Sequence, residues 1–211
     1  MTYDTLRVKV GRRPITVVEL DLDSCANTFG VAPCTAVLGP AGKCFNTYGT
    51  CQDTANFAKV AKTYRFCTQT DLLPVGENLL PCLTKVELAP VQIDPKGFSV
   101  SGTVTVEAVD FPHHDRGVDP YWRDRAYKPE QQGTFFGKLR GRNAYVENRV
   151  MRVKEGYIAG DRTIYTRTRT YFIDRIEGPD ANGKVRIIGK DPLRFADSEK
   201  AKAPDVSKGA C

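Results

Sequence analysis

The sequence lacks a long apolar run. No stretch of its 211 residues approaches the roughly 20 consecutive apolar residues that a membrane-spanning helix needs. The first residues, MTYDTLRVKVGRRP, contain neither the apolar segment nor the small-residue cleavage site of a secretory signal. We therefore expect a chain that is not inserted in a membrane and that folds in a reducing cytoplasm.

The motifs of common enzymes are also missing. The stretch GKLRGRN has two glycines among basic residues but neither the P-loop nor the dinucleotide-binding spacing, so we interpret it as a turn with a solvated basic edge. His113 and His114 are the only histidines, and adjacent residues on a strand point in opposite directions. We expect them in a loop, not in a metal site. No Ser-His-Asp set stands out, and we expect no enzymatic activity.

The charge is mildly basic. The chain has 31 Lys and Arg against 25 Asp and Glu, a net charge of +6, and 41% of its residues are hydrophobic. This composition is typical of a globular protein with a core of its own. A dedicated nucleic-acid-binding protein usually shows a more concentrated basic patch, so the charge is weak support for such a partner.

Cysteine, in contrast, is abundant, with seven residues. In a reducing compartment, cysteine clusters bind metal or do chemistry more often than they form disulfides. Four of them follow the pattern C-x8-C-x9-C-x6-C, which is wider than the knuckle of structural zinc sites and differs from common ferredoxin spacings. The pattern predicts a thiolate site at Cys25, Cys34, Cys44 and Cys51 and leaves an iron–sulfur cluster, zinc and disulfides open.

The other three cysteines are predicted to have different roles. We interpret Cys67 and Cys82 as buried small apolar side chains, with the alternatives that they pair with each other or replace one of the four upstream thiols. Cys211 ends a polar stretch and is not expected to be a ligand.

Periodicity predicts mostly strands after the cysteines. Strands are expected in Pro14–Asp23, in FSVSGTVTVEAV, in RVMRVKEGYI and in RTIYTRTRTYFIDRIEG, with an Asn-Gly turn that joins the last of these to VRIIGK as a hairpin. Helical character is expected in DTANFAKVAKTY, with Asp53 or Thr54 as the N-cap, and in a short helix that starts with Asp191 and Pro192.

Arginine is dense in the later strands. In YTRTRTY, strand periodicity places Tyr165, Arg167, Arg169 and Tyr171 on one face, which predicts either a protein interface or an exposed sheet face covered by aliphatic stems. Trp122, the only tryptophan, is expected to anchor a loop at a subunit contact or to lie at the rim of the core.

The cysteine-rich stretch resembles a known family. The segments LDLDSC, APC and GKCFNTYGTCQDTANF are similar to the cysteine-rich region of the tail tip hub proteins of lambda-like siphophages and gene transfer agents, in which a C-x8-C pair, a C-x6-C pair and an Asn-Phe dipeptide, here Asn56-Phe57, follow one another. The resemblance implies that the four upstream cysteines bind a four-iron (4Fe-4S) iron–sulfur cluster. Zinc stays as the alternative.

The later sequence resembles the β-domains of the same hub proteins. GTFFGKLRGRNAYVENRVMRVKEGYI and TRTYFIDRIEGPDANGKVRIIGKDPLRFAD carry this likeness. It implies a mainly β fold, with a hub-type β-barrel or β-sandwich, a loop-rich cysteine insertion and short helices. We expect N-terminal strands in 1–24, the iron–sulfur insertion in 25–83, the hub β-domain in 84–200 and a linker to a further part in 201–211.

The resemblance also implies partners. Hub proteins form a ring of three at the distal end of a long non-contractile tail, and they contact the distal tail protein, the tape measure protein and the central fibre or receptor-binding protein. We therefore expect a homotrimeric structural protein of the virion, located at the tail tip or baseplate and assembled in the host cytoplasm. DNA would meet it only in passage. Its cluster would act as a structural staple.

Two other functions stay open. One is an iron–sulfur redox or sensor protein, although no flavin or nucleotide motif accompanies the cysteines. The other is a zinc module that binds nucleic acid, although the basic residues are mixed with Asp and Glu, unlike a stripe that follows phosphates.

Overall fold

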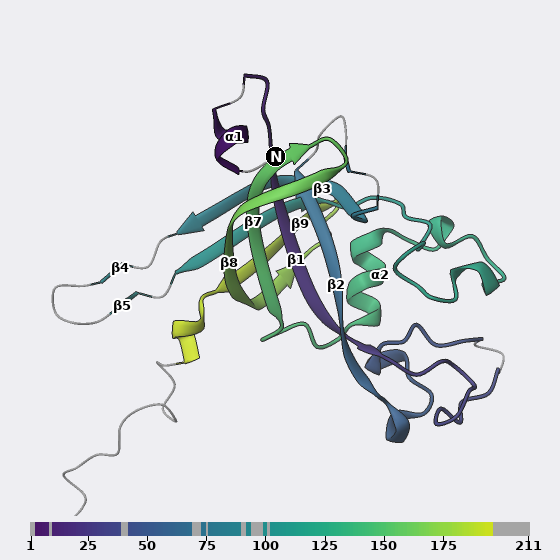
Figure 1. Ribbon diagram of the computed structural model, residues 1–211. Helices are drawn as coiled ribbons and strands as arrows, with labels where there is room; N and C mark the ends of the chain where they lie inside the picture. Colours follow the sequence, from purple (N-terminus) through teal and green to yellow (C-terminus); the bar gives the residue numbers. More distant parts are fainter. Residues whose placement is uncertain are drawn as a thin grey trace, which may run out of the picture.

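The structure is a computed structural model that describes residues 3–8, 10–38, 42–68, 73–74, 76–89, 92–93, 99–100 and 102–195. Within these ranges the protein is mainly β (Figure 1). The barrel strands are β1 (Arg13–Cys25), β2 (Lys59–Thr68), β3 (Leu79–Ala89), β6 (Thr103–Val109), β7 (Val150–Ala159), β8 (Arg162–Glu177) and β9 (Lys184–Lys190).

These seven strands form a closed barrel in the order β1-β2-β3-β6-β9-β8-β7. All neighbours are antiparallel except β2 and β3, which are parallel over a short register from Arg65 opposite Leu79 to Thr68 opposite Leu83. The two-residue strands β4 (Gln92–Ile93) and β5 (Ser99–Val100) form a separate small sheet between β3 and β6, at the far end of that hairpin (Figure 1).

The helices are short. They are α1 (Tyr3–Arg7) and α2 (Phe135–Arg142), together with 3₁₀ helices at Tyr48–Thr50, Thr54–Asn56, Trp122–Asp124, Pro129–Gln131 and Pro192–Phe195. α2 lies beside the barrel, on the same side as the irregular segment that joins β1 to β2 (Figure 1).

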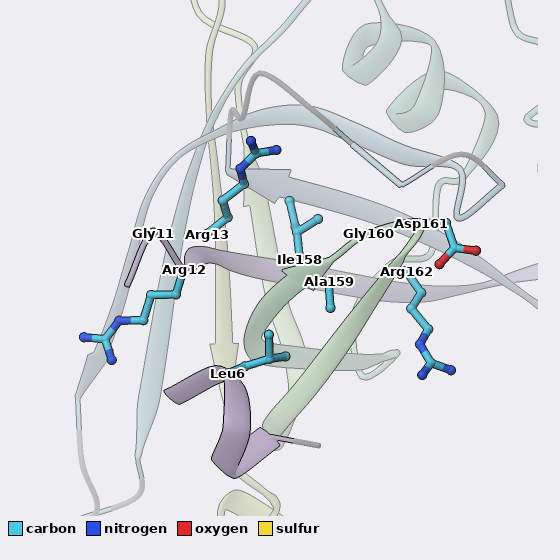
Figure 2. Close-up of a pocket in the computed structure, with 9 residues that line it drawn as sticks. All are labelled: Leu6, Gly11, Arg12, Arg13, Ile158, Ala159, Gly160, Asp161 and Arg162. Atoms are coloured by element: carbon cyan, nitrogen blue, oxygen red, sulfur yellow. The ribbon is translucent and has the colours of Figure 1, made fainter. Parts of the chain in front are cut away.

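A hollow of about 680 Å³ lies near α1, between Leu6 and the β7–β8 turn. Arg12, Arg13 and Arg162 line it, but their guanidinium groups point in different directions (Figure 2). The hollow is therefore not organised around a single anion.

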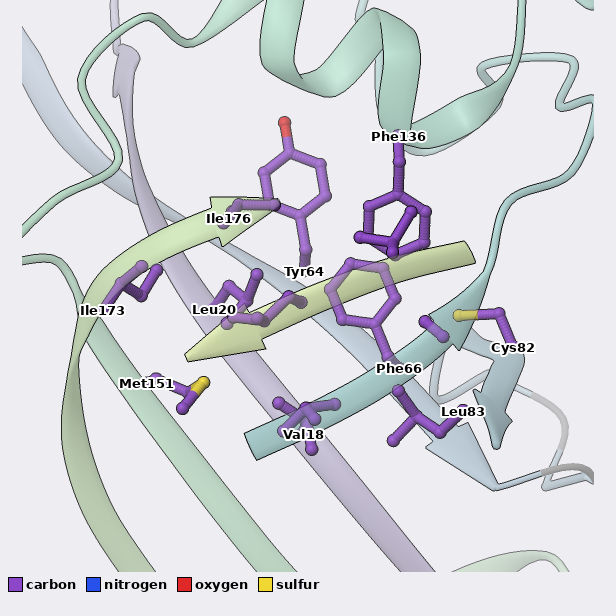
Figure 3. Packing of buried hydrophobic residues seen from close by; sticks show 14 of the residues in the cluster. Val18, Leu20, Tyr64, Phe66, Cys82, Leu83, Phe136, Met151, Ile173 and Ile176 are labelled. Carbon is purple, nitrogen blue, oxygen red and sulfur yellow. The ribbon is translucent and has the colours of Figure 1, made fainter. Parts of the chain in front are cut away.

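The barrel interior holds the main core. Phe66 of β2 stacks on Phe136 of α2 with ring centroids 5.3 Å apart, and Phe135 meets Phe66 edge-on at 5.7 Å (Figure 3). Leu139, one turn after Phe135, is also buried in this cluster. Because α2 places its apolar face against the interior, the helix is fixed relative to the barrel wall.

The outer face of β1 is also covered. Ile15 and Val17 pack in a second cluster with Cys67, while Val18 and Leu20 face the interior. Further along the same outer face lies Glu19, which is 3% exposed. Its carboxylate accepts hydrogen bonds from Lys154 at 2.8 Å, Arg152 at 3.0 Å and Arg65 at 3.1 Å. β1 is therefore packed on both faces, and Cys25 is its last residue.

Most strand predictions are confirmed. Pro14–Asp23 lies within β1, and β6, β7 and β8 match the three later predictions. In β6 the side chains of Val104, Val106 and Ala108 are buried, as the alternation predicts. β8 and β9 pair antiparallel around the predicted Asn-Gly turn. At Asp191 the predicted helix start is a 3₁₀ turn, in which the carboxylate accepts the Leu193 amide at 2.9 Å. Residues 196–204 of that prediction lie outside the described ranges.

One helix prediction and one turn prediction are wrong. DTANFAKVAKTY forms only the 3₁₀ helix Thr54–Asn56, and β2 then starts at Lys59. Pairing with β1 and burial of Tyr64 and Phe66 in the barrel favour the strand over the helical propensity of Ala and Lys. GKLRGRN, interpreted as a turn, lies in α2, because Phe135, Phe136 and Leu139 form one apolar helical face.

The predicted Arg and Tyr face of β8 is also wrong. The register between β7 and β8 shifts at Gly156, so the alternation breaks between Tyr165 and Arg167. Tyr171 is buried in the barrel core, and Tyr165 packs against the outer cluster. The four side chains therefore do not form one exposed face.

The cysteine-rich segment leaves the barrel over a shorter range than expected. Residues 59–68 and 79–83 of the predicted 25–83 insertion are barrel strands. The remaining stretch, 26–58, contains no strand among its described residues and forms an irregular lobe at the end of β1 (Figure 1).

Candidate functional site: a pocket lined by four cysteines

The four cysteines predicted as ligands line one pocket. Cys25 is the last residue of β1, Cys51 follows the 3₁₀ helix Tyr48–Thr50, and Cys34 and Cys44 lie in irregular chain. The pocket is tight, with a cavity of only about 10 Å³ between the side chains that line it. All four thiols are half-buried and free of disulfides. The fold thus brings together thiols from both pairs of the spacing pattern.

Asn46 joins Cys25 to Cys44. Its side-chain amide donates to the Cys25 carbonyl at 3.3 Å, and its backbone carbonyl accepts the Cys25 amide at 2.7 Å. The Cys44 thiol donates to the Asn46 side-chain oxygen at 3.5 Å. Asn46 has φ of 55°, a left-handed conformation that asparagine adopts more readily than most residues. This turn places the Cys44 side chain beside the end of β1.

Asp53 joins Cys51 to the chain around Cys34. The Asp53 amide donates to the Cys51 sulfur at 3.4 Å. Its carboxylate accepts from the Thr35 amide at 2.7 Å and the Thr35 hydroxyl at 2.9 Å. The pKa of Asp53 is lowered by these hydrogen bonds, most by the one from the Thr35 amide and next by one from the Asn56 side chain. Asp53 therefore does not cap the helix that follows it but ties two ligand loops together.

The thiols influence each other electrostatically. Burial raises the pKa of Cys44, a hydrogen bond from Asn46 opposes this, and the neighbouring Cys51, Cys34 and Cys25 raise the pKa further. Removing protons from several thiols in one pocket is unfavourable without positive charge between them. A bound metal would supply that charge, although the four thiols as they stand in the described chain are not arranged to hold a single metal ion.

Cys67 and Cys82 have the structural role predicted for them. Both are buried, Cys67 in the outer cluster and Cys82 in the barrel core (Figure 3), and neither lines the four-cysteine pocket. Burial raises the pKa of Cys67 to about 11 and that of Cys82 further still. Such thiols are poor nucleophiles and poor ligands. They lie in different clusters and form no disulfide. Cys211 lies outside the described residues.

His113 and His114 lie in the loop between β6 and α2, as predicted. Each ring accepts a backbone amide hydrogen bond two residues on, at 2.9 Å and 3.0 Å. Trp122 is half-buried and stacks with Arg123, whose guanidinium carbon lies 5.2 Å from the ring centroid. Among the residues that the structure describes, no group of three or more His, Cys, Asp or Glu side chains is arranged to hold a single metal ion.

The residues that support the pocket were not among those predicted from the sequence. Asn46 and Asp53 each stand two positions after a cysteine, which is a detectable spacing signal. Arg125, which donates to the Cys44 carbonyl at 2.9 Å, has no such signal because it is remote in the sequence.

The fold and pocket define a mainly β, closed-barrel protein with a four-thiol pocket beside the barrel. A scan against protein-family models found no matching family, and a search of curated proteins found no similar sequence. No helix in the described part of the chain is long and apolar enough to cross a membrane.

Proposed function

We propose that this protein is a structural hub protein of the tail tip of a long-tailed phage, and that Cys25, Cys34, Cys44 and Cys51 hold an iron–sulfur cluster of the four-iron type. The convergence of these four thiols on one pocket is the observation that carries the proposal. The sequence resemblance to tail tip hub proteins supplies the assignment to a phage tail.

The donor set fits an iron–sulfur cluster chemically. Thiolates are the ligands that such clusters take, and the pocket offers four of them. The Asp53 amide already donates to the Cys51 sulfur at 3.4 Å, and hydrogen bonds to ligand sulfurs are a feature of cluster sites. The Asn46 turn holds the Cys44 side chain beside Cys25.

The cluster would act as a brace for the lobe. Among the described residues, 26–58 have only two single-turn 3₁₀ helices, and Phe29 and Ala36 of this segment form a small apolar cluster with Tyr121 of the loop between β6 and α2. Such a segment buries little apolar surface, and metal binding to its cysteines adds directly to its folding energy. Four ligands spread over the lobe would tie its loops to the end of β1.

The barrel would supply the rigid body of a ring-forming subunit. Tyr145, which follows α2, and Tyr48 of the lobe are 70% and 51% exposed, and together with Phe57 of the lobe they line a mainly apolar hollow. Exposed tyrosines are frequent contact residues in protein interfaces. We propose a homotrimer that contacts the distal tail protein, the tape measure protein and the central fibre protein.

The nucleic-acid alternative is less well supported by the charge arrangement. Arg65, Arg152 and Lys154 are all paired with the buried Glu19, and Arg149 and Lys59 are paired with Asp23. Basic side chains engaged in this way do not form a free stripe for phosphates.

Genetic complementation tests the hub assignment. Phage with the gene deleted should produce tails that lack a normal tip in electron micrographs, and the wild-type gene should restore it. The Cys51→Ser variant should fail to restore tips, whereas Cys82→Ala, which alters a thiol outside the pocket, should restore them. Normal tails from the deletion would refute the hub assignment.

A further test separates a brace from a redox carrier. Assembled particles are exposed to mild reductant or oxidant, short of iron loss, and infectious units are counted. A brace predicts unchanged infectivity. A reversible loss of infectivity at constant iron content would favour a redox or sensor function.

A further inference from the structure

Arg125, in the loop between β6 and α2, contacts three consecutive residues of the lobe. Its guanidinium donates to the backbone carbonyl of Cys44 at 2.9 Å and also to that of Lys43. The guanidinium carbon of the same group lies 4.0 Å from the centroid of the Phe45 ring. Three consecutive residues around one predicted ligand are thus held by a single side chain that is remote in the sequence.

Arg125 is itself rigidly held. It makes two hydrogen bonds to Asp119, at 2.8 Å and 3.1 Å, and the two side chains are 6% and 0% exposed. The Asp119 carboxylate also accepts the Tyr121 amide at 3.0 Å, and the Asp119 amide donates to the Asp115 carbonyl at 2.9 Å. A buried ion pair with its hydrogen bonds satisfied is a stiff support.

A second arginine completes the arrangement. The guanidinium carbon of Arg142, at the end of α2, lies 4.0 Å from the centroid of the Phe45 ring, which is contacted in the same way by Arg125. Arg142 donates to the Asp115 carboxylate at 2.7 Å. Phe45 is therefore held between two cations that are both anchored on the loop between β6 and α2.

The same loop also contacts the other half of the lobe. The Tyr121 hydroxyl accepts the Phe29 amide at 2.7 Å, and their rings meet edge-on with centroids 6.3 Å apart. Cys34 and Cys44 both pack against this aromatic pair. The loop thus reaches the chain around two of the four cysteines.

We infer that Arg125 is a positioning residue for the four-cysteine pocket, and that through its grip on residues 43–45 it sets the position of the Cys44 thiol. This inference rests on the proposed cluster for its function, but the geometric part can be tested without metal. A lysine in place of Arg125 keeps the positive charge. The lysine ammonium lacks the planar, forked set of donors of a guanidinium. It therefore cannot make two parallel hydrogen bonds to Asp119 and also bind the carbonyls of Lys43 and Cys44.

The test compares Arg125→Lys with Arg123→Lys. The control changes an exposed arginine of the preceding 3₁₀ helix, whose guanidinium carbon lies 5.2 Å from the centroid of the Trp122 ring. Metal-free protein is treated with an alkylating reagent, and the rate at each cysteine is measured by mass spectrometry. Arg125→Lys should speed alkylation of Cys44. Cys51, which is held by Asp53, and Cys67, which is buried in the outer cluster, should keep their wild-type rates.

Iron binding gives the second readout. Protein reconstituted with ferrous iron and sulfide is challenged with a chelator, and the loss of iron is followed by visible absorption. Loss of a supporting contact typically weakens metal binding by about 10- to 100-fold, and we expect Arg125→Lys to release iron faster by a factor in this range. The Arg123→Lys control should behave like wild type.

The two proposals fail in distinguishable ways. If wild-type protein takes up no iron, the proposed cluster is refuted while the alkylation pattern still decides the role of Arg125. The positioning role is refuted if Arg125→Lys leaves the alkylation rate of Cys44, or the rates of all four pocket thiols, at the wild-type values. It is also refuted if the rate of iron release is unchanged. If Arg125→Lys does not fold, the same measurements are made on Phe45→Leu. This variant removes the ring contacts with Arg125 and Arg142 and leaves the ion pair between Arg125 and Asp119.

Discussion

Asp115 is the buried charge on which the support of the lobe depends most. It is 1% exposed, and its carboxylate accepts hydrogen bonds from Lys138 and Arg142, each at 2.7 Å. The side chains of these two cations are only 9% and 11% exposed. Replacing Asp115 by Asn removes the negative charge and leaves two buried cations uncompensated. Asn also accepts the φ of 62° found at this position, so the backbone is not strained by the change.

The expected loss is large. Removing one partner of a buried ion pair costs about 3–5 kcal/mol. For a domain of this size each kcal/mol corresponds to roughly 2–4 °C, so Asp115→Asn should lower the unfolding midpoint by roughly 6–20 °C. The assay is thermal unfolding followed by circular dichroism at neutral pH. The control is Asp124→Asn, which removes an exposed carboxylate paired with Lys43 at 2.7 Å and should change the midpoint little.

The pH dependence separates charge from shape. Burial would raise the pKa of Asp115, but the hydrogen bonds from its surrounding side chains, Lys138 and Arg142 among them, hold that pKa well below its usual range. A carboxylate with a lowered pKa stabilises the folded state above the pKa of the unfolded chain, and this contribution is lost as the pH falls below about 4. The difference between wild type and Asp115→Asn should therefore shrink in acid. A midpoint within 2 °C of wild type at neutral pH, or a difference that grows in acid, would refute the reasoning.

Three further predictions concern the barrel and its cysteines. A Cβ on Gly189 would lie 2.3 Å from Met151 Cε and 2.9 Å from Val104 Cγ1, so Gly189→Ala should cost about 1–3 kcal/mol in urea unfolding, and an unchanged midpoint would contradict the packing. Gly141 in α2 has no atom within 4 Å of such a Cβ, so Gly141→Ala should stabilise the protein by about 0.5–1 kcal/mol, and a loss would argue against the helix. Cys82→Ser buries a hydroxyl in the core, so it should cost about 1–3 kcal/mol of stability and keep the iron content. Cys44→Ser should lose iron and make residues 26–58 sensitive to protease. Equal damage from both variants would contradict the assignment of ligands.

The strands could be predicted from the sequence because their signals are local. In β6 alternate residues are apolar, and the Asn-Gly pair before β9 supplies the left-handed turn, with Gly183 at φ of 74°. β2 could not be predicted from propensity. Its Ala and Lys residues favour a helix, and only pairing with β1, a non-local contact, decides for the strand. The parallel pairing of β2 with β3 is likewise set by the closure of the barrel.

The candidate site also has residues that local sequence signals reveal and residues that they do not. The four thiols could be singled out by residue type and spacing, because few other side chains bind soft metals. The residues that position them could not. Arg125 and Tyr121 act on the lobe from a loop between β6 and α2, and Phe45 carries no sign in the sequence that it lies between two arginines.

Whether the four thiols hold an iron–sulfur cluster is decided by the iron and acid-labile sulfide content of protein purified without air. We expect a brown protein with about four iron and four sulfide per chain and a cluster-type visible spectrum. Both should be lost in Cys44→Ser and kept in Cys82→Ala. A colourless protein with zinc in place of iron, or with four alkylatable thiols and no metal in the pocket, would contradict it.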